Sequence, residues 1–327
     1  MKKSSLPAFY REIGGELQKT EKRLRELTAS DNEELQEAAL KLINRGGKRL
    51  RPALVLLAGK CGSGTKNEEK LIDAAAAIEL IHTASLIHDD VVDKTPLRRG
   101  RPTLNRLYGT ETAVYCGDLL LLNAITAITS CGGEAVFEAV CDTAAKMCQG
   151  EFLQSRTAAT ANLNNAEYLT VIRRKTANLM ACACKIGAII GEGDAKTVAA
   201  LTLFGENLGL AFQITDDILD YIADDSVFGK RIGSDLREGL ATMPLICAYE
   251  QSTEKERLRQ LFRLSRSSEK AAEELLTIVN RGDGCKRAAE IAANYVQEAK
   301  AALRDIENEE IRHCFDEIAD AVSERQR

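Results

Sequence analysis

Two segments of the sequence repeat the pattern Asp-Asp-x-x-Asp, which brings three carboxylates together within a few residues. The six aspartates are Asp89, Asp90 and Asp93 in SLIHDDVVD and Asp216, Asp217 and Asp220 in QITDDILD. On an α-helix, the first and last aspartates of each motif share one face, about 6 Å apart along the axis, and the middle one points roughly 100° away. Carboxylates without a nearby Cys or His cluster select a hard cation such as magnesium, which shares its coordination with phosphate oxygens. The motifs therefore predict magnesium held against a bound diphosphate.

Each motif follows a strongly apolar segment, and this placement favours a chemical role over a structural one. A single Asp-Asp-x-x-Asp copy is explained at least as well by an acidic helix end that faces solvent. Two copies beside apolar helices are costly, because like charges repel near a low-dielectric core unless positive groups compensate them. The pair of motifs therefore predicts that cations gather at the same places.

Basic residues do occur in clusters beside glycines, as a diphosphate site requires. The clusters are Lys48, Arg49 and Arg51 in GGKRLRP, Arg98, Arg99 and Arg101 in LRRGRPT, Arg173, Arg174 and Lys175 in RRKT, and Lys230 in FGKR. Any one of them is adequately explained as solvated surface charge, but together with the acidic motifs they favour a polyanion bridged by metal. His82, two turns before Asp89, fits a phosphate ligand and a packing residue equally well, whereas His88 fits packing better.

The segments that must position these residues have the pattern of helices. Apolar residues recur at helical spacing, no convincing strand pattern is present, and no proline lies between Pro102 and Pro244. The predicted helices include residues 33–45, capped by Ser30 or Asp31, and residues 51–60, 68–93 and 208–222. The last two are apolar enough to be surrounded by other helices. Because there is no linker and no repeat, the chain is predicted to be all-α, with a single domain over residues 1–327.

Composition narrows the class of protein. The 327 residues carry a formal charge of −5 with no basic block, which argues against a nucleic-acid partner. The N-terminus lacks the apolar core of a secretory signal, and Asp118, Glu134 and Lys185 interrupt or bound the apolar runs, so no transmembrane segment is predicted. Ten cysteines are scattered without zinc-site spacings. They are interpreted as reduced, packed thiols, and the protein is expected to be cytoplasmic.

With these motifs in their order along the chain, the sequence resembles the trans-isoprenyl diphosphate synthase, or polyprenyl synthetase, family from GGKRLRP to DLREGLATMPL. The resemblance implies a bundle of antiparallel helices around a deep central cavity, usually as a homodimer. It implies a magnesium-dependent prenyltransferase that condenses isopentenyl diphosphate with an allylic diphosphate. Magnesium and cationic side chains would stabilise the departing diphosphate, and the isopentenyl double bond would attack the allylic carbocation that remains.

The resemblance also implies roles for individual residues. The implied magnesium ligands are Asp89, Asp93 and Asp216, supported by Asp90, Asp217 and Asp220, and the catalytic candidates are Asp89, Asp93, Asp216 and Lys175. The implied isopentenyl diphosphate site is Lys48, Arg51, His82 and Arg99, and the implied allylic diphosphate site is Arg98, Lys175, Thr176, Gln213 and Lys230. One departure is Leu240, which stands where the family often has lysine and bears on one contact to the allylic phosphate.

Product length should depend on the residues below the first motif, where the growing chain would run. Only Val91 and Val92 separate Asp90 from Asp93, without the insertion of bacterial short-chain farnesyl diphosphate synthases. One turn below lie the small Ala84 and Ser85, where short-chain members of the family carry a bulky aromatic floor, and Ile81 lies one turn further. This predicts a medium- or long-chain product, longer than geranylgeranyl, while small residues here also suit helix packing.

Several alternatives stay open at this point. A geranylgeranyl or farnesyl diphosphate synthase would use the same chemistry for a shorter product. A non-catalytic partner subunit of a heteromeric prenyltransferase is disfavoured because both the acidic and the basic sets are intact. A terpene cyclase usually pairs one aspartate-rich motif with an Asn/Ser/Glu motif, and a helical scaffold protein would need neither.

Overall fold

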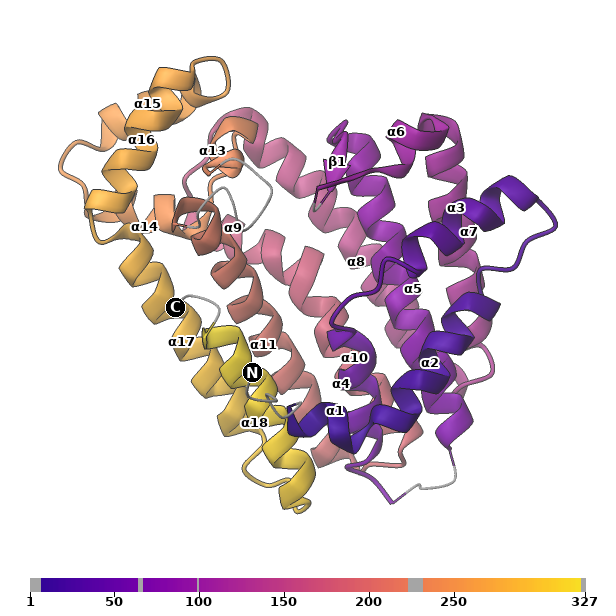
Figure 1. The fold of residues 1–327 in the computed structure, drawn as a ribbon. Coiled ribbons are helices and arrows are strands. Elements are labelled where there is room, and N and C mark those ends of the chain that lie inside the picture. The colour runs from indigo at the N-terminus through magenta and orange to yellow at the C-terminus, as the bar shows by residue number, and fades with distance from the viewer. Residues whose placement is uncertain (1–6, 64–66, 99, 223–231, 325–327) are drawn as a thin grey trace, which may run out of the picture. The chain divides into compact units, whose positions relative to one another are not determined.

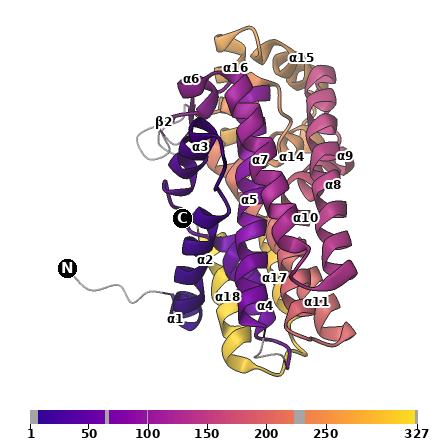
Figure 2. The same ribbon diagram turned by 90° about the vertical axis from the view of Figure 1, so that its right-hand side faces the viewer.

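The structure is a computed structural model that describes residues 7–63, 67–98, 100–222 and 232–324. Figures 1 and 2 show a chain built almost entirely from helices. In this part of the chain, strands are limited to a short antiparallel hairpin of β1 (Leu97–Arg98) and β2 (Arg101–Pro102), in which Arg98 pairs with Arg101. The predicted all-α class is therefore confirmed.

By its internal contacts the chain divides into two compact units. The first unit comprises Met1–Ala144, Leu179–Gly205 and Ala302–Ile318, and the second comprises Ala145–Asn178, Glu206–Ala301 and Ala319–Arg327. Long helices contribute residues to both, namely α8 (Gly133–Thr160), α11 (Ala195–Ile222) and α18 (Glu309–Glu324). A single domain over residues 1–327 stays a prediction.

The first unit is organised around one long helix, α5. Its other helices and α5 itself are α1 (Ala8–Glu12), α2 (Gly14–Glu26), α3 (Glu33–Ile43), α4 (Leu50–Gly59), α5 (Glu68–Val92), α6 (Leu104–Tyr108), α7 (Thr110–Ile128) and α10 (Asn178–Ile190). α5 lies alongside α2, α4 and α7 (Figures 1 and 2). Residues 74–81 are all buried, and because successive residues turn by about 100°, every face of this stretch is covered. The expectation of a central, surrounded helix is confirmed.

The second unit is built around the C-terminal half of α11, which contains the predicted helix over residues 208–222. Its remaining elements are α9 (Asn165–Ile172), the π-helix η1 (Arg173–Ala177), α13 (Ser234–Glu238), α14 (Met243–Gln251), α15 (Lys255–Ser265), α16 (Glu269–Arg281) and α17 (Gly284–Ala302). Tyr168, Ile214 and Ile246 belong to one buried cluster, which joins α9, α11 and α14. Phe262 and Leu275 belong to a second cluster, which joins α15 and α16. The second acidic motif thus lies on a helix held on several sides.

Three of the described helices, α5, α7 and α11, are long and apolar enough to cross a membrane by length and composition alone. In their most apolar stretches, 67%, 39% and 50% of the residues, respectively, are buried inside the protein. Packing accounts for the apolar composition of α5, whereas α7 leaves Tyr115 and Leu122 exposed. The expectation that the chain has no transmembrane segment stays a prediction.

Candidate functional site

The first acidic motif forms the C-terminal end of α5 in the first unit. Asp89 is half-buried, Asp90 is buried, and Asp93, the C-cap residue, is exposed. The last turn of α5, which the structure describes in full, contains no basic residue. The carboxylates therefore lie where the helix dipole is already negative. This arrangement costs stability unless cations approach from other segments or from a ligand complex.

Asp90, the middle aspartate, is bound by the protein itself. Arg98 donates from Nε to Asp90 Oδ1 at 2.8 Å, and Asn105 donates from Nδ2 to the backbone oxygen of Asp90 at 3.2 Å. The Asp90 side chain is 10% exposed, whereas that of Arg98 is 35% exposed. Asp90 therefore anchors the β1–β2 hairpin, on which Arg98 lies, to the end of α5.

Sequence reasoning does not single out Arg45, a further cation beside this hairpin. Arg45 donates from Nη2 to the backbone oxygen of Pro102 at 2.6 Å. Burial lowers the pKa of the Arg45 guanidinium, the charge of Arg101 lowers it further, and the charge of Asp90 opposes both. Two nearby cations, one of them half-buried, suit an anionic ligand. The available signal was an arginine directly ahead of the GGKRLRP cluster.

The basic residues of GGKRLRP separate on folding. Lys48 is exposed just before α4, and Arg51 is half-buried in the first turn of α4. The side chain of Arg49, between them, is only 9% exposed. One sequence cluster therefore contains a buried structural cation as well as the two predicted ligands of isopentenyl diphosphate.

The two histidines of α5 have different surroundings. His82 is half-buried, and its backbone oxygen accepts a hydrogen bond from Ser85 Oγ at 2.9 Å. His88 lies against Gly117 of α7, where a Cβ atom would come within 2.4 Å of His88 Nε2. The same nitrogen lies 3.3 Å from Asp118 Oδ1. His88 therefore joins α5 to α7, which is the packing role expected for it.

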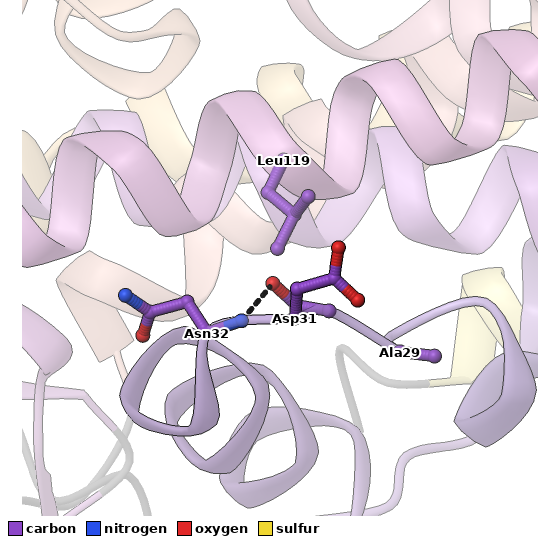
Figure 3. A pocket seen from close by; sticks show the side chains of 5 residues that line it. Ala29, Asp31, Asn32 and Leu119 are labelled. Carbon is purple, nitrogen blue, oxygen red and sulfur yellow. Dashed lines mark hydrogen bonds between the residues drawn. The ribbon is translucent and has the colours of Figure 1, made fainter.

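The predicted chain-length residues lie along the same helix. Ala84 and Ile81 are buried, with 2% and 3% of their surface exposed, and Ser85 is half-buried. A hollow of about 520 Å³ in the first unit lies elsewhere, lined by residues 29–32 and Leu119. Figure 3 shows Leu119 pointing from α7 toward this turn, in which the Asn32 N–H donates to Ser30 Oγ at 3.1 Å. A second hollow, of about 430 Å³ in the second unit, is lined by Arg174 of the RRKT cluster but by none of the residues to which the resemblance gives a role.

In the second motif the middle aspartate is again bound internally, but by neutral groups. Asp217 is 4% exposed. Tyr168 donates from its hydroxyl to Asp217 Oδ2 at 2.5 Å, and Gln213 donates from Nε2 to Asp217 Oδ1 at 2.9 Å. Thr176 in turn donates to Gln213 Oε1 at 2.7 Å. Two predicted ligands of the allylic diphosphate, Thr176 and Gln213, thus belong to one chain of hydrogen bonds that ends on Asp217.

Burial controls the protonation of Asp217. Desolvation raises its pKa to about 7, although hydrogen bonds from Tyr168 and Gln213 favour the charged form, and the charges of Asp216 and Asp220 raise the pKa further. The pKa of the Tyr168 hydroxyl also lies well above its usual value, chiefly because of burial. Tyr168 therefore remains a hydrogen-bond donor across the accessible pH range.

Asp220 has a structural role that the sequence did not predict. Its carboxylate accepts hydrogen bonds from Ser234 Oγ at 2.7 Å and from the backbone N–H of Asp235 at 3.0 Å. Its backbone oxygen accepts one from the Gly233 N–H at 2.7 Å. Asp220 thus binds the N-terminal end of α13, where backbone donors lack helical partners. Its additional role as a metal ligand stays a prediction.

The predicted lysine of the second unit lies in a π-helix, η1, a local irregularity that often marks functional sites. Lys175 Nζ pairs with Glu151 Oε2 of α8 at 2.5 Å. At Gly209 of α11, a Cβ atom would lie 2.5 Å from the Cα of Ala177, so η1 packs directly on the backbone of α11. This close contact positions Lys175 and Thr176 relative to the second motif.

Some sequence predictions fall outside this geometry. Arg99 and Lys230 lie outside the described residues. Leu240, at the position where the family often has lysine, is half-buried and donates its N–H to the Asp235 backbone oxygen at 2.8 Å. Among the described residues, no group of three or more His, Cys, Asp or Glu side chains is placed to hold a metal ion.

Comparison with known proteins identifies relatives over almost the whole chain. The polyprenyl synthetase family model matches residues 32–279. A short chain isoprenyl diphosphate synthase from Methanothermobacter thermautotrophicus is 39% identical over 298 residues, which are 90% of this chain and 91% of the relative. Heptaprenyl diphosphate synthase component 2 from Geobacillus stearothermophilus is 34% identical, with 98% of this chain and 99% of the relative covered.

Solved structures agree with these sequence relatives. The heptaprenyl diphosphate synthase from Staphylococcus aureus has a TM-score of 0.91 at 29% identity, covering 96% of this chain and 99% of that one. A polyprenyl synthase from Caulobacter crescentus, complexed with calcium and isoprenyl diphosphate, has a TM-score of 0.90 at 32% identity, covering 98% and 97%. The described helices therefore follow a fold shared by prenyl chain-elongating enzymes.

Proposed function

Because the chain belongs to the polyprenyl synthetase family of trans-prenyltransferases, we propose that it condenses isopentenyl diphosphate with an allylic diphosphate in a magnesium-dependent reaction. It is a prenyltransferase that elongates prenyl diphosphates. The observation that supports the proposed assignment of residues is the division of labour within each acidic motif. The middle aspartates, Asp90 and Asp217, are buried and organise neighbouring segments through their side chains, whereas Asp89 and Asp216 are half-buried.

The carboxylates fit magnesium better than a cation that takes all its ligands from the protein. Magnesium keeps water and is commonly bound through one or two carboxylates together with substrate phosphates. Within the described residues, neither motif brings three His, Cys, Asp or Glu side chains together around one point. Binding through one or two carboxylates and a substrate phosphate is compatible with this arrangement. Asp89 and Asp93 of the first motif and Asp216 of the second would hold the ions. Bound magnesium would supply positive charge to the diphosphate that leaves.

The basic side chains complete the proposed chemistry. Lys48, Arg51, His82 and Arg99 would bind isopentenyl diphosphate, and Arg98, Lys175, Thr176, Gln213 and Lys230 would bind the allylic diphosphate. Cations near the allylic diphosphate would favour breakage of the carbon–oxygen bond of that substrate. The double bond of isopentenyl diphosphate would then form the new carbon–carbon bond with the allylic cation, and transfer of a proton to the released diphosphate would restore a double bond. Residues that exclude water protect the cation from hydrolysis.

We propose a medium- or long-chain product because Ala84 and Ser85 are small. The Geobacillus relative is named for a heptaprenyl product and the Methanothermobacter relative for short chains, so a geranylgeranyl or farnesyl diphosphate synthase stays the alternative. Ala84→Phe should shorten the product. Because Ala84 is buried and a phenyl ring could disturb packing, Ser85→Phe at a half-buried position provides a second test. Unshortened products from both folded variants would contradict the floor model.

Exposed apolar residues on α7 and α8 bear on how many subunits assemble. Tyr115 and Leu122 of α7 and Phe137 of α8 are large apolar residues of the first unit that stay exposed, by 60%, 64% and 37%. Exposed apolar side chains on two successive helices favour a subunit interface, and we propose a homodimer. The name of the Geobacillus relative, a component 2, supports a partner subunit as the second candidate. Activity of the purified chain alone, with its mass in solution, separates the two.

The cysteines support a reducing location. All ten are free thiols, and burial raises the pKa of Cys61 and of Cys131 to about 12. Buried thiols with a raised pKa are unreactive, and unpaired cysteines are typical of proteins that fold in a reducing compartment. We therefore propose that the protein is cytoplasmic, which fractionation of cells that express it would test.

The decisive experiment is incubation of the purified protein with labelled isopentenyl diphosphate and each allylic primer, followed by chromatography of the dephosphorylated products. Consumption that requires magnesium and yields chains longer than geranylgeranyl supports the full proposal. Products no longer than geranylgeranyl would support the short-chain alternative. No consumption with any primer, restored by a second subunit, would support the partner role.

A further inference from the structure

The loop that carries Lys48 contains a residue in a backbone conformation that L-amino acids seldom adopt. Arg49, the N-cap of α4, has φ 48° and ψ 38°, in the left-handed region. Such conformations persist when the surrounding structure enforces them, and they gather at functional sites. The contacts of the Arg49 side chain show what enforces this one.

The Arg49 guanidinium joins separate segments of the first unit. Nη1 donates to Glu79 Oε1 of α5 at 2.9 Å, and Nε and Nη2 pair with the Glu21 carboxylate of α2. Nη2 also donates to the Ile43 backbone oxygen, at the end of α3, at 2.9 Å. The Arg49 and Glu79 side chains are each 9% exposed. A planar guanidinium between two carboxylates is restrained in orientation as well as in place.

A second contact holds the same loop from α1. The hydroxyl of Tyr10 donates to the backbone oxygen of Lys48. Residues 46–49 form neither helix nor strand, and Gly46 has a positive φ of 71°. The position of this loop therefore depends on side-chain contacts, of which the buried pair between Arg49 and Glu79 is the best shielded from solvent.

We propose that Arg49 is a positioning residue for the isopentenyl diphosphate site. Its buried ion pairs hold the loop so that Lys48 faces solvent and α4 begins where Arg51 can reach the same ligand. Glu79 lies three residues before His82 on α5, so the pair ties the loop to the helix that carries a third predicted ligand. The inference rests on the proposed function, because it takes Lys48, Arg51 and His82 as ligands of that diphosphate.

A second ion pair between α2 and α5, to which we assign only a structural role, provides the matched control. Arg23 of α2 donates from Nε to Asp73 Oδ1 of α5 at 2.6 Å, so this pair joins the same two helices. Asp73 precedes Glu79 by six residues, or about 9 Å along α5. If Arg49 only fastens α2 to α5, variants of the two pairs should behave alike.

The test measures KM separately for isopentenyl diphosphate and for an allylic primer, with purified full-length variants. Arg49→Lys replaces the planar fork with a single ammonium, and Glu79→Gln keeps the side-chain volume while removing the charge. Each should raise KM for isopentenyl diphosphate by about tenfold or more, because a misplacement of about 1 Å can cost up to about 10². KM for the primer should change by less than about twofold. Asp73→Asn should leave both KM values within about twofold.

Glu79→Gln keeps the test decisive if Arg49→Lys does not fold. No rise in KM for isopentenyl diphosphate, equal rises for both substrates, or the same pattern in Asp73→Asn would overturn the positioning role. Lys48→Ala and Arg51→Ala in the same assay show which idea has failed. If they raise this KM and the Arg49 and Glu79 variants do not, only the positioning inference is wrong. If they leave it unchanged, the proposed isopentenyl diphosphate site is wrong, and the inference falls with it.

Discussion

The two Asp-Asp-x-x-Asp motifs differ in what holds their middle aspartate. In the first unit Asp90 pairs with the charged Arg98, whose side chain is 35% exposed. In the second unit Asp217 lies in a buried site, where the neutral groups of Tyr168 and Gln213 bind it. One aspartate therefore keeps a cation in place, whereas the other holds a chain of neutral hydrogen bonds.

Two identical short motifs can therefore share a chemical role while their supporting contacts differ. In each motif the middle side chain leaves the helix about 100° from the first aspartate and organises the neighbouring segment. Asp90 organises a hairpin that carries predicted substrate ligands, and Asp217 organises η1 and α9 through Gln213 and Tyr168. We expect substitutions at outer positions to have similar effects in both motifs, and substitutions at middle positions to have different ones.

The largest effect is expected at the outer positions. Asp89→Ala and Asp216→Ala should each lower kcat by about 10³-fold or more, because each removes a proposed metal ligand at the departing diphosphate. The helical circular dichroism spectrum should stay unchanged. The exposed Glu138, on α8, offers a control, and Glu138→Ala should retain activity. Near-normal turnover of either folded aspartate variant would contradict the assignment of the metal ligands.

The next largest effect concerns stability and pH in the metal-free protein. The pKa of Asp217 is raised to about 7, so the folded state binds this proton more tightly than the unfolded state. The resulting stability is present at low pH and lost as pH rises through about 7. An asparagine side chain at this position would mimic the protonated acid at every pH. The free energy of unfolding of Asp217→Asn, minus that of the natural protein, should therefore rise by roughly 2 to 3 kcal/mol when the pH is raised from 5 to 8.

Urea unfolding of both proteins at the two pH values measures this gain. Other titrating groups are common to both proteins, so their contributions largely cancel in the difference. A difference in the free energy of unfolding that does not change with pH would show that Asp217 is charged in the fold. The contrast with the ion-paired Asp90 would then disappear.

Much of this arrangement follows from the sequence, for identifiable reasons. The apolar length of α5 and α11 and the spacing of the aspartates are local properties, so the helices and the motif faces were predictable. Gln213 lies four residues before Asp217 on the same helix, so helical spacing does carry a signal for that contact. The contacts of Asp217 with Tyr168 and of Asp220 with Ser234 join different helices, and helical spacing carries no signal for them. The buried role of Arg49 was hidden for the same reason, because its neighbours in GGKRLRP are also basic.

A smaller effect should separate the middle aspartates by activity at pH 7. Asp90→Asn weakens the charged bond that places Arg98, and it should raise KM for the allylic primer by about tenfold. Asp217→Asn keeps a neutral hydrogen-bonding group where a half-protonated acid stood, and it should leave this KM within about twofold. Steady-state kinetics with isopentenyl diphosphate saturating measures both. Equal rises in the two variants would mean that charge matters as much in the second motif as in the first.

The smallest effect is expected from the Tyr168 hydroxyl. Tyr168→Phe removes one hydrogen bond to Asp217 and should cost about 1 kcal/mol of unfolding free energy. It should also raise the magnesium concentration for half-maximal rate by about threefold, because Asp216, the neighbouring residue, loses support within α11. Tyr221→Phe is the matched control, since that buried hydroxyl lies 3.1 Å from Thr242 Oγ1 and not on an aspartate. If both variants lose the same stability and only Tyr168→Phe needs more magnesium for half-maximal rate, the hydroxyl supports the metal-binding motif. If the magnesium requirement rises in both variants, or in neither, the Tyr168 hydroxyl has only a structural role.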